Sequence, residues 1–243
     1  MNFLYKSNES KQKSRDYVLQ YVRDKKKENP SFSVIDVGGG LNPWANEVVD
    51  AYMDVHNPNQ SKNVFVGDIN EPEVWESIIA SQKRFDFSIC THTLEDIRDP
   101  IFVLKQIMKI SKSGYISFPN KHTEFSNHQS HYWNGSCHHR WVFTVKTDEQ
   151  GDKLFFMPIW PSAAYFNSCF LNPWVSLKQI LCLTNKDKNH GSRKLPWWKA
   201  SLKSDKNELG FIWNENIRFE YLDYMRPDKS ITNDYRELLR EGL

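Results

Sequence analysis

The chain has 243 residues, of which 39% are hydrophobic and 26% charged, a composition that excludes wholesale disorder. Its 32 basic and 30 acidic residues leave a net charge of +2, which provides no global field to hold nucleic acid. No segment approaches the ~18 consecutive apolar residues of a membrane span, and the first residues lack the apolar core of a signal peptide. We expect a soluble, cytoplasmic protein with no membrane partner.

The cysteines are scattered and form no CxxC pair; they are Cys90, Cys137, Cys169 and Cys182. This spacing does not indicate a disulfide framework, and we expect reduced thiols in a cytosol-like compartment.

The first predicted elements are a helix, a strand and a glycine-rich turn. Residues 10–28 place apolar side chains on one helical face among charges and end in a lysine run before Asn29-Pro30. An apolar, β-branched run then leads into three consecutive glycines, Gly38, Gly39 and Gly40, which predicts a buried strand and a tight turn. A helix is expected over 43–50, since proline is tolerated in a first turn.

Strands and helices then alternate up to residue 120. The predicted elements are strands at 51–55 and 63–68, a helix at 71–82, a strand at 85–92, a helix at 99–111 and a strand at 113–120. This order indicates an α/β fold with a doubly wound parallel sheet, because βαβ crossovers are right-handed. Such sheets bind ligands beyond the carboxyl ends of their strands.

The rhythm changes after Asn120. Residues 121–141 are predicted to be a long functional loop, and strands are expected at 153–159, 208–213 and 217–222, the last two as a hairpin. We therefore expect a single domain over 1–243: an N-terminal helix (1–30), a ligand-binding core (31–120) and a C-terminal elaboration that contains antiparallel strands (121–243).

Acidic residues end three successive predicted strands. Asp36 precedes the glycines, whose missing Cβ atoms let a ligand approach the backbone. Asp54 lies 18 positions after Asp36, close to the ~20 expected for a carboxylate that binds a ribose diol. Asp68 ends the third strand, where a carboxylate can accept from an adenine amino group.

Over residues 31–120 the chain resembles the class I S-adenosylmethionine-dependent methyltransferases, whose motif is an acidic residue followed by glycines at alternating positions. Asp36, Gly38 and Gly40 match it, while Asn42 stands where the next family glycine would fall. The resemblance implies a Rossmann-like methyltransferase sheet and S-adenosylmethionine as cofactor. Its methionine part would lie against the glycines, Gly39 included, with its amino group bound through water by Asp36. The nucleoside would be bound by the following strand ends, Asp54 with Val55 and Asp68 with Ile69.

Residues 91–100, THTLEDIRDP, resemble the segment after the fourth strand in many small-molecule methyltransferases. The resemblance places Thr91 and His92 beside the methionine end of the cofactor. Asp96 stands where the usual ending, Leu-Glu-His, has histidine. A nicotinamide cofactor is the competing interpretation of the glycine turn, but the third glycine of its motif would fall at Pro43.

A second constellation is rich in histidine; it contains His122, His128, His131, Cys137, His138 and His139, followed by Arg140 and Trp141. One hypothesis is a substrate pocket in which a histidine acts as general base. We name His92, His138 and His139 as candidate bases, and His131, Arg140 and Trp141 as candidate substrate contacts. The alternatives are a zinc site or a plain polar loop. No metal is assigned, because the spacing matches no ordinary zinc pattern and adjacent histidines point in different directions in an extended segment.

The predicted function is direct in-line methyl transfer to a small polar metabolite. Two alternatives remain open: a cofactor-binding scaffold without catalysis, and an RNA methyltransferase that uses the basic residues of 184–206 as an arm. Tryptophans concentrate in the second half; we expect Trp133, Trp141, Trp160 and Trp174 to be mostly core, and Trp197 and Trp198 to form a lid or partner surface.

Overall fold

A computed structural model describes most of the first 159 residues and one later segment. The described ranges are 2–41, 43–56, 63–81, 84–120, 124, 128–130, 133–134, 136, 138–159 and 207–221, with the backbone alone at 128–130, 133–134 and 207.

A seven-stranded mixed sheet forms the centre of the fold, in the order β1-β11-β6-β5-β2-β3-β4. Its strands are β1 (Tyr5–Ser10), β2 (Val34–Val37), β3 (Ala51–Asp54), β4 (Asn63–Val66), β5 (Phe85–Thr91), β6 (Ser111–Pro119) and β11 (Asn207–Asn214). The five strands from β2 to β6 pair in parallel, whereas β11 is antiparallel to both β6 and β1. All four residues of β2 are buried, as expected for a parallel strand covered on both faces.

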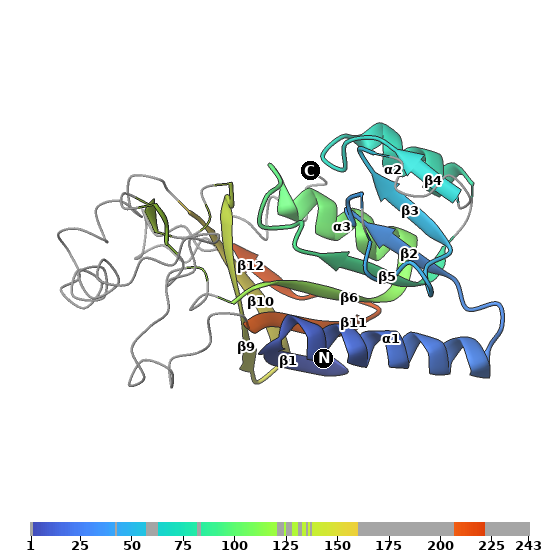
Figure 1. The fold of residues 1–243 in the computed structure, drawn as a ribbon, viewed down its shortest axis with the longest axis horizontal. Helices are drawn as coiled ribbons and strands as arrows, with labels where there is room; N and C mark the ends of the chain where they lie inside the picture. The colour runs from blue at the N-terminus through green and yellow to red at the C-terminus, as the bar shows by residue number, and fades with distance from the viewer. Residues whose placement is uncertain are drawn as a thin grey trace.

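Helices cover both faces of this sheet, with α1 (Lys11–Glu28) on one side and α2 (Pro72–Ala80) and α3 (Pro100–Ile110) on the other (Figure 1). Val18 and Val22 of α1 belong to a buried cluster with Phe87 and Ile89 of β5. Residues of α2 and α3 join a separate, larger cluster on the opposite face. The predicted doubly wound α/β fold is therefore confirmed.

A three-stranded sheet lies across the end of β6 (Figure 1). It contains β9 (Trp141–Asp148), β10 (Gly151–Pro158) and β12 (Phe219–Tyr221), in the order β12-β10-β9. Phe143 of β9 stacks on Phe118 of β6 with ring centroids 4.5 Å apart. Asp152 of β10 binds Lys6 of β1 at 2.6 Å, so the second sheet is attached to both the centre and the edge of the first.

The helix expected over 43–50 is wrong: residues 44–48 form turns. The amides of Val48 and Val49 both bond to the carbonyl of Ala45, at 2.9 and 3.2 Å, and no longer ladder follows. The chain must reach β3 at Ala51 at once, because the Asp50 amide already bonds to the Val34 carbonyl at 2.9 Å. These tertiary bonds outweigh the weak helix propensity of two adjacent valines.

The hairpin expected from 208–213 and 217–222 is also wrong, since β11 joins the central sheet while β12 pairs in parallel with β10. The loop expected over 121–141 contains two short strands that pair with each other, β7 (His128–Ser130) and β8 (Trp133–Asn134). Strands β1 and β9 were not predicted. None of the helices in the described ranges is long and apolar enough to cross a membrane.

The cap of α3 provides a test of the local architecture. The Asp99 carboxylate accepts from the amides of Ile101 at 3.0 Å and Phe102 at 2.9 Å, whereas Ser10, the N-cap of α1, makes no side-chain cap bond. We expect Asp99→Ala to lower the free energy of unfolding by about 1 kcal/mol, with a clearly smaller loss for Ser10→Ala. Urea unfolding monitored by circular dichroism measures both; equal losses would contradict the capping role.

Candidate functional site

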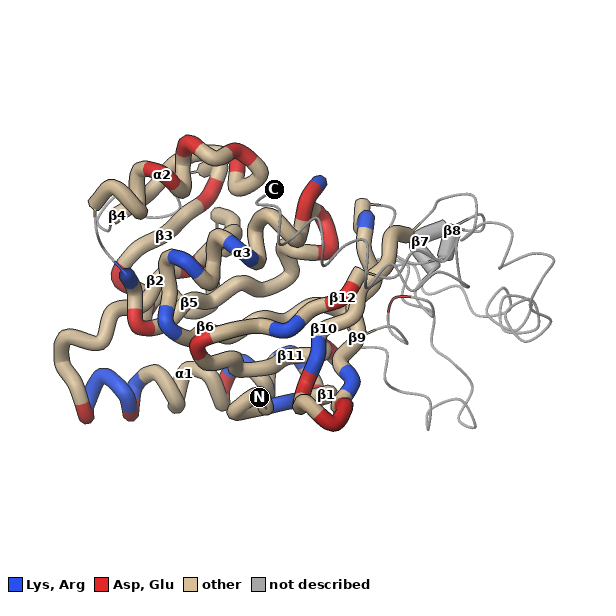
Figure 2. Tube along the Cα trace, turned by 180° about the vertical axis from the view of Figure 1, so that it is seen from behind, with Lys and Arg blue, Asp and Glu red and all other residues tan. Residues whose placement is uncertain are grey.

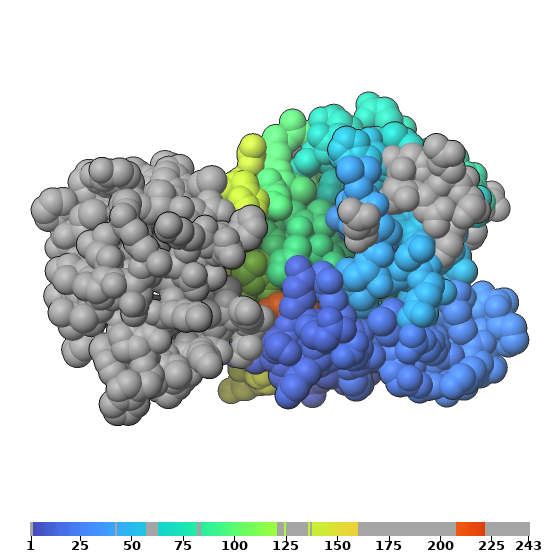
Figure 3. Space-filling model, viewed as in Figure 1, coloured from blue at the N-terminus to red at the C-terminus, as the bar shows by residue number. Residues whose placement is uncertain are grey.

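The glycine turn after β2 adopts a backbone that favours glycine. Gly38 and Gly40 have φ of +76° and +69°, in the left-handed region. A Cβ at Gly38 would overlap the side chain of Thr93, and one at Gly39 would overlap the Asp36 carboxylate. At Gly40 nothing lies within 4 Å of the same position, so that backbone faces open space. Figure 3 shows the molecule from the side of Figure 1, with a hollow in the surface above α1.

Asp36 is the most unusual group of the site. It is 1% exposed, and neither carboxylate oxygen has a hydrogen-bond partner among the described residues. Burial, together with the charge of Asp54, raises the pKa of Asp36 to about 7, although the charge of Arg15 opposes this shift. A buried carboxylate without a donor costs free energy, so this position is suited to a cationic or hydrogen-bonding ligand.

Asp54 is buried but partnered. Its two oxygens accept from the amides of Gly40 at 2.8 Å and His56 at 3.0 Å. The bond to Gly40 ties the glycine turn to the end of β3. The residues that directly follow Gly40 and Asp54 are apolar and exposed: Leu41 is 61% exposed and Val55 is 54% exposed. Exposed apolar groups beside a buried carboxylate suit a ligand with a polar edge and an apolar face.

Asp68 and Ile69 follow β4 and differ in exposure. Asp68 is exposed and accepts from the amide and side chain of Asn70, both at 2.8 Å, and these bonds lower its pKa. Ile69 is buried, and its carbonyl accepts from the Trp75 indole at 2.9 Å. The turn that carries both residues is therefore held rigidly beside the end of β4.

Three residues that were not predicted complete the glycine-turn side. The hydroxyl of Thr93 donates to the Gly38 carbonyl at 3.0 Å, and the Trp44 indole donates to the Thr91 hydroxyl at 3.0 Å. Arg15 lies over the Trp44 ring at 5.0 Å, and its Nε is buried without an acceptor among the described residues. The sequence did contain a signal for Arg15, because it shares a helical face with the buried Val18 and Val22.

His92, directly after β5, is held between two buried carboxylates. Its Nε2 lies 2.8 Å from Glu208 and its Nδ1 lies 3.3 Å from Glu95. Burial lowers the pKa of His92, but the bond to Glu208 and the charge of Glu95 outweigh this and raise it above its ordinary value. Tyr115 also donates to Glu208, at 2.9 Å. His92 is therefore protonated over a wider pH range than an ordinary histidine.

A second group of titratable side chains lies beyond His92. Nε2 of His138 and Nε2 of His139 lie 3.9 and 3.7 Å from Oδ1 of Asp96. Nδ1 of His139 lies 2.6 Å from the buried Glu124. The adjacent histidines do not diverge as expected: the chain turns here, with the His139 amide bonded to the Ser136 carbonyl at 3.1 Å, so that both rings face Asp96.

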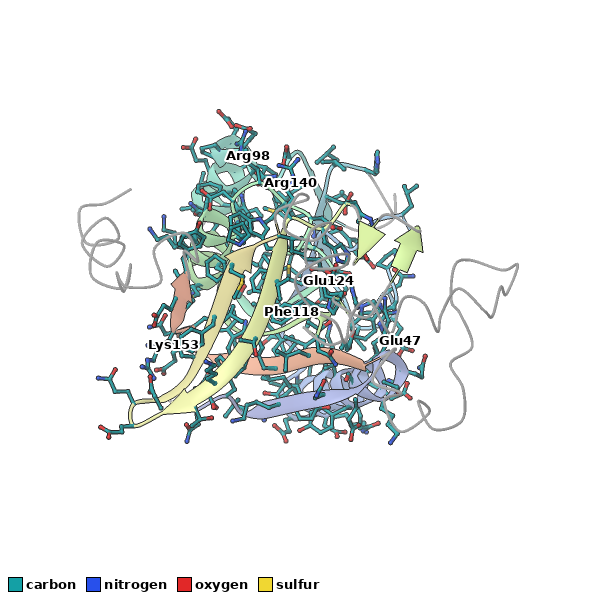
Figure 4. All side chains as sticks on the ribbon, turned by 90° about the vertical axis from the view of Figure 1, so that its left-hand side faces the viewer. Glu47, Arg98, Phe118, Glu124, Arg140 and Lys153 are labelled. Atoms are coloured by element: carbon teal, nitrogen blue, oxygen red, sulfur yellow. The ribbon has the colours of Figure 1, made fainter. Side chains whose placement is uncertain are left out.

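Of the candidate substrate contacts, Trp141 packs into the fold whereas Arg140 is exposed. The amides of Arg140 and Trp141 both bond to the Glu95 carbonyl, at 2.6 and 3.2 Å, which fixes the start of β9 against the segment after β5. The Trp141 indole donates to the Ile97 carbonyl at 2.8 Å and its ring packs on Phe156, so this side chain supports the fold. Arg140 is exposed; Figure 4 shows it near Arg98, above Glu124 and Phe118 in that view.

Several predicted residues cannot be placed. The residues that lie outside the described ranges are His122, His131, Cys137, Trp160, Cys169, Trp174, Cys182, Trp197 and Trp198, together with the whole of 184–206. Of His128 and Trp133 only the backbone is described. Cys90 is buried as a free thiol.

The residues at the carboxyl ends of β2, β3 and β4 fit the cofactor that the sequence predicts. The partnerless carboxylate of Asp36 suits the amino group of a methionine moiety, and the open backbone at Gly40 suits its close approach. Beside them Arg15, with a buried Nε that lacks an acceptor among the described residues, suits a carboxylate.

One family of known proteins matches this chain. A family model described as a methyltransferase domain matches residues 7–149. A search of curated proteins finds no match. Among solved structures, the plantazolicin methyltransferase BpumL in complex with SAH has 11% identity and a TM-score of 0.40 over 84% of each chain. The N-terminal domain of EvdMO1, with SAH and D-fucose present, has 10% identity and a TM-score of 0.37 over 81% of this chain and 82% of that one. The glycopeptide N-methyltransferase MtfA, complexed with sinefungin, has 8% identity and a TM-score of 0.34 over 80% of this chain and 85% of that one.

The raised pKa of Asp36 predicts an unusual pH dependence of stability. The unfolded chain loses this proton near pH 3.8, whereas the folded chain keeps it to about 7. Between these values the folded state binds more protons, so the free energy of unfolding falls as pH rises. We expect Asp36→Asn to stabilise the protein at pH 8 by on the order of 4 kcal/mol, and the difference to vanish near pH 4. Urea unfolding between pH 4 and 8 measures this.

Asp86→Asn is the control of opposite sign. Burial raises the pKa of Asp86, but bonds from Lys112 and Ser33 outweigh it and lower the pKa. Its replacement should therefore destabilise the protein at pH 8. Parallel pH profiles for wild type and Asp36→Asn would contradict the assignment of Asp36.

Proposed function

This chain belongs to the methyltransferase-domain family and is an S-adenosylmethionine-dependent methyltransferase, and we propose that its acceptor is a small polar metabolite. The observation that carries the proposal is the partly buried group of carboxylates and imidazoles that lies beyond the end of β5, where the cofactor's methionine part is expected. The cofactor supplies an activated methyl group on a sulfonium, so the protein's contribution is binding, orientation and exclusion of water.

The amino-acid end of the cofactor is proposed to lie between two opposite charges. Asp36 accepts from the ammonium group, directly or through water, and Arg15 donates to the carboxylate. Both groups gain a partner on binding, because within the described part of the chain the Asp36 oxygens have no donor and Nε of Arg15 has no acceptor. Gly38, Gly39 and Gly40 allow the backbone to approach this end without a clash.

The nucleoside end is proposed to lie over the ends of β3 and β4. Asp54 already accepts from two amides, and the remaining lone pairs of its carboxylate can accept from a ribose diol. Val55 offers an exposed apolar face to the base, while Asp68 and the amide of Ile69 lie at the next strand end.

The polar group beyond His92 is proposed to bind the acceptor. Asp96, Glu95 and Glu124 bring negative charge to this side, which opposes the entry of a phosphate backbone. Figure 2 shows acidic residues along α2, basic residues along α3 and both kinds along α1, so this view of the described chain presents no basic stripe. A neutral or cationic small molecule with hydroxyl or amine groups suits the site better than RNA.

The three candidate bases differ in suitability. Both ring nitrogens of His92 face carboxylates, so this histidine is proposed to supply positive charge beside the methionine end and not to remove a proton. The side chain of His138 is 59% exposed and that of His139 only 9%. These two remain the candidates that face the acceptor side, and a base role for either stays a prediction.

The role of Arg15 predicts a loss of affinity that depends on the ligand. We expect Arg15→Met to weaken binding of S-adenosylmethionine and S-adenosylhomocysteine by about tenfold or more, since both carry the amino-acid carboxylate. Binding of 5′-methylthioadenosine, which lacks that carboxylate, should not change. Arg23→Met is the matched control, because Arg23 lies on the same helix but pairs with Glu47. Isothermal titration measures all three ligands; an equal loss for methylthioadenosine would refute the role.

The acceptor class predicts the outcome of a substrate screen. Pools of polyhydroxylated and amine metabolites should support release of S-adenosylhomocysteine, whereas RNA should not exceed the background of a Gly40→Val protein. Valine at position 40 cannot adopt the observed φ of +69° without strain and serves as the inactive control. Turnover of RNA, with metabolites inert, would overturn the proposed acceptor class and leave the cofactor assignment intact.

A further inference from the structure

We propose that Asp96, His138 and His139 form a binding site for a divalent transition-metal ion on the acceptor side of the methyltransferase. One ligand atom from each residue lies within 4.8 Å of the others. Both imidazole Nε2 atoms lie less than 4 Å from the same oxygen, Oδ1 of Asp96. Ligand atoms about 2.1 Å from a tetrahedral ion are roughly 3.4 Å apart, so a small contraction of this group would enclose one.

Glu124 orients His139 in the way that a carboxylate orients a metal-bound histidine, by accepting from its second ring nitrogen. Its carboxylate lies 2.6 Å from Nδ1 of His139 and also accepts from the Ser136 amide at 2.8 Å. Nδ1 of His139 therefore carries the proton and Nε2 is left to face Asp96. Histidine ligands in proteins nearly always donate their second nitrogen to a carboxylate or carbonyl in this way, which fixes the tautomer and the ring orientation.

Unsatisfied acceptors at the same place indicate a missing cation. Oδ1 of Asp96 is buried and accepts no hydrogen bond from the described residues, and the same holds for both oxygens of Glu95. The nearest described cation to Glu95 is Nδ1 of His92, at 3.3 Å, and His92 is shared with Glu208. Buried acceptors without donors are costly, and a dication at Asp96 would offset the charge of both acidic side chains.

The backbone holds the ligand-bearing segments together before any ion binds. Asp96 follows β5, whereas His138 and His139 precede β9, and the amides of Arg140 and Trp141 both bond to the Glu95 carbonyl. The Trp141 indole adds a bond to the Ile97 carbonyl at 2.8 Å. The three ligands therefore come from two segments that are fixed to each other, as a preformed site requires.

The donor set selects the ion. Two imidazoles and one carboxylate suit Zn²⁺, Co²⁺, Ni²⁺ or Fe²⁺, whereas Mg²⁺ and Ca²⁺ prefer oxygen ligands throughout. With the ion bound, the Nε2 atoms of His138 and His139 are occupied, so neither histidine acts as the base. Three protein ligands leave at least one position open. If the proposed function holds, that position is available to a hydroxyl oxygen of the acceptor, which narrows the acceptor class to metal-binding alcohols or diols.

The test is a Co²⁺ titration of the full chain, prepared without a histidine tag and without cofactor, followed by visible absorption. Wild type should bind one equivalent with visible ligand-field bands that Zn²⁺ abolishes and millimolar Mg²⁺ does not. We expect Asp96→Asn, His138→Ala and His139→Ala each to weaken binding at least tenfold, and Glu124→Gln to weaken it by about 10- to 100-fold. His56→Ala, which removes an exposed histidine outside the cluster, should bind as wild type does.

Affinity for S-adenosylhomocysteine, measured on the same variants, reports that the fold is intact and separates the two proposals. Metal binding that is absent in wild type, or that is unchanged by all four variants, overturns the site whatever the cofactor result. Co²⁺ binding that follows the expected pattern, in a protein that fails to release S-adenosylhomocysteine with any acceptor, supports the metal site and counts only against the proposed function.

Discussion

The main physical constraint on this structure is the unfavourable burial of the Asp36 carboxylate. No described residue donates to either of its oxygens, and its pKa is raised to about 7. A side chain of this kind destabilises the unliganded fold at neutral pH, and an apolar residue of similar size would be cheaper to bury. Its retention at the end of β2 is explained if a cationic ligand completes it, so that binding recovers the free energy that folding has lost.

The neighbouring acidic residues, Asp54 and Asp68, differ from Asp36 because their carboxylates accept hydrogen bonds within the fold. Asp54 accepts from two amides and organises the glycine turn, and Asp68 closes its own turn through Asn70. Both have structural partners and a remaining capacity to accept, whereas Asp36 has only the latter. Three residues that look alike in sequence thus divide into one carboxylate that no described residue hydrogen-bonds and two that hold the chain in place.

The sequence predicted the part of the site that is made locally. Strand, acidic residue and glycine turn follow one another along the chain, so periodicity and spacing were enough to locate Asp36, Asp54 and Asp68. What it did not predict depends on contacts between distant segments. The packing of α1 places Arg15 over Trp44 and close enough to Asp36 to affect its pKa. His138 and His139 both face Asp96 because the chain turns at Ser136–His139 and the backbone of 140–141 is bonded to Glu95. The helix expected over 43–50 was replaced by turns for the same reason: tertiary bonds at Asp50 decide where β3 begins.

Basic side chains approach the candidate site from α1, and acidic side chains lie beyond His92. Lys11 and Arg15 approach from α1, and both are coupled electrostatically to Glu208, which also binds His92. Beyond His92, the side chains of Glu95, Asp96 and Glu124 are acidic. Under the proposed function, a cofactor whose carboxylate lies towards α1 has its sulfonium farther from these basic residues. This arrangement of charges is suited to orienting the cofactor of the proposed function, whose carboxylate is attracted to the basic residues of α1 and whose sulfonium is not.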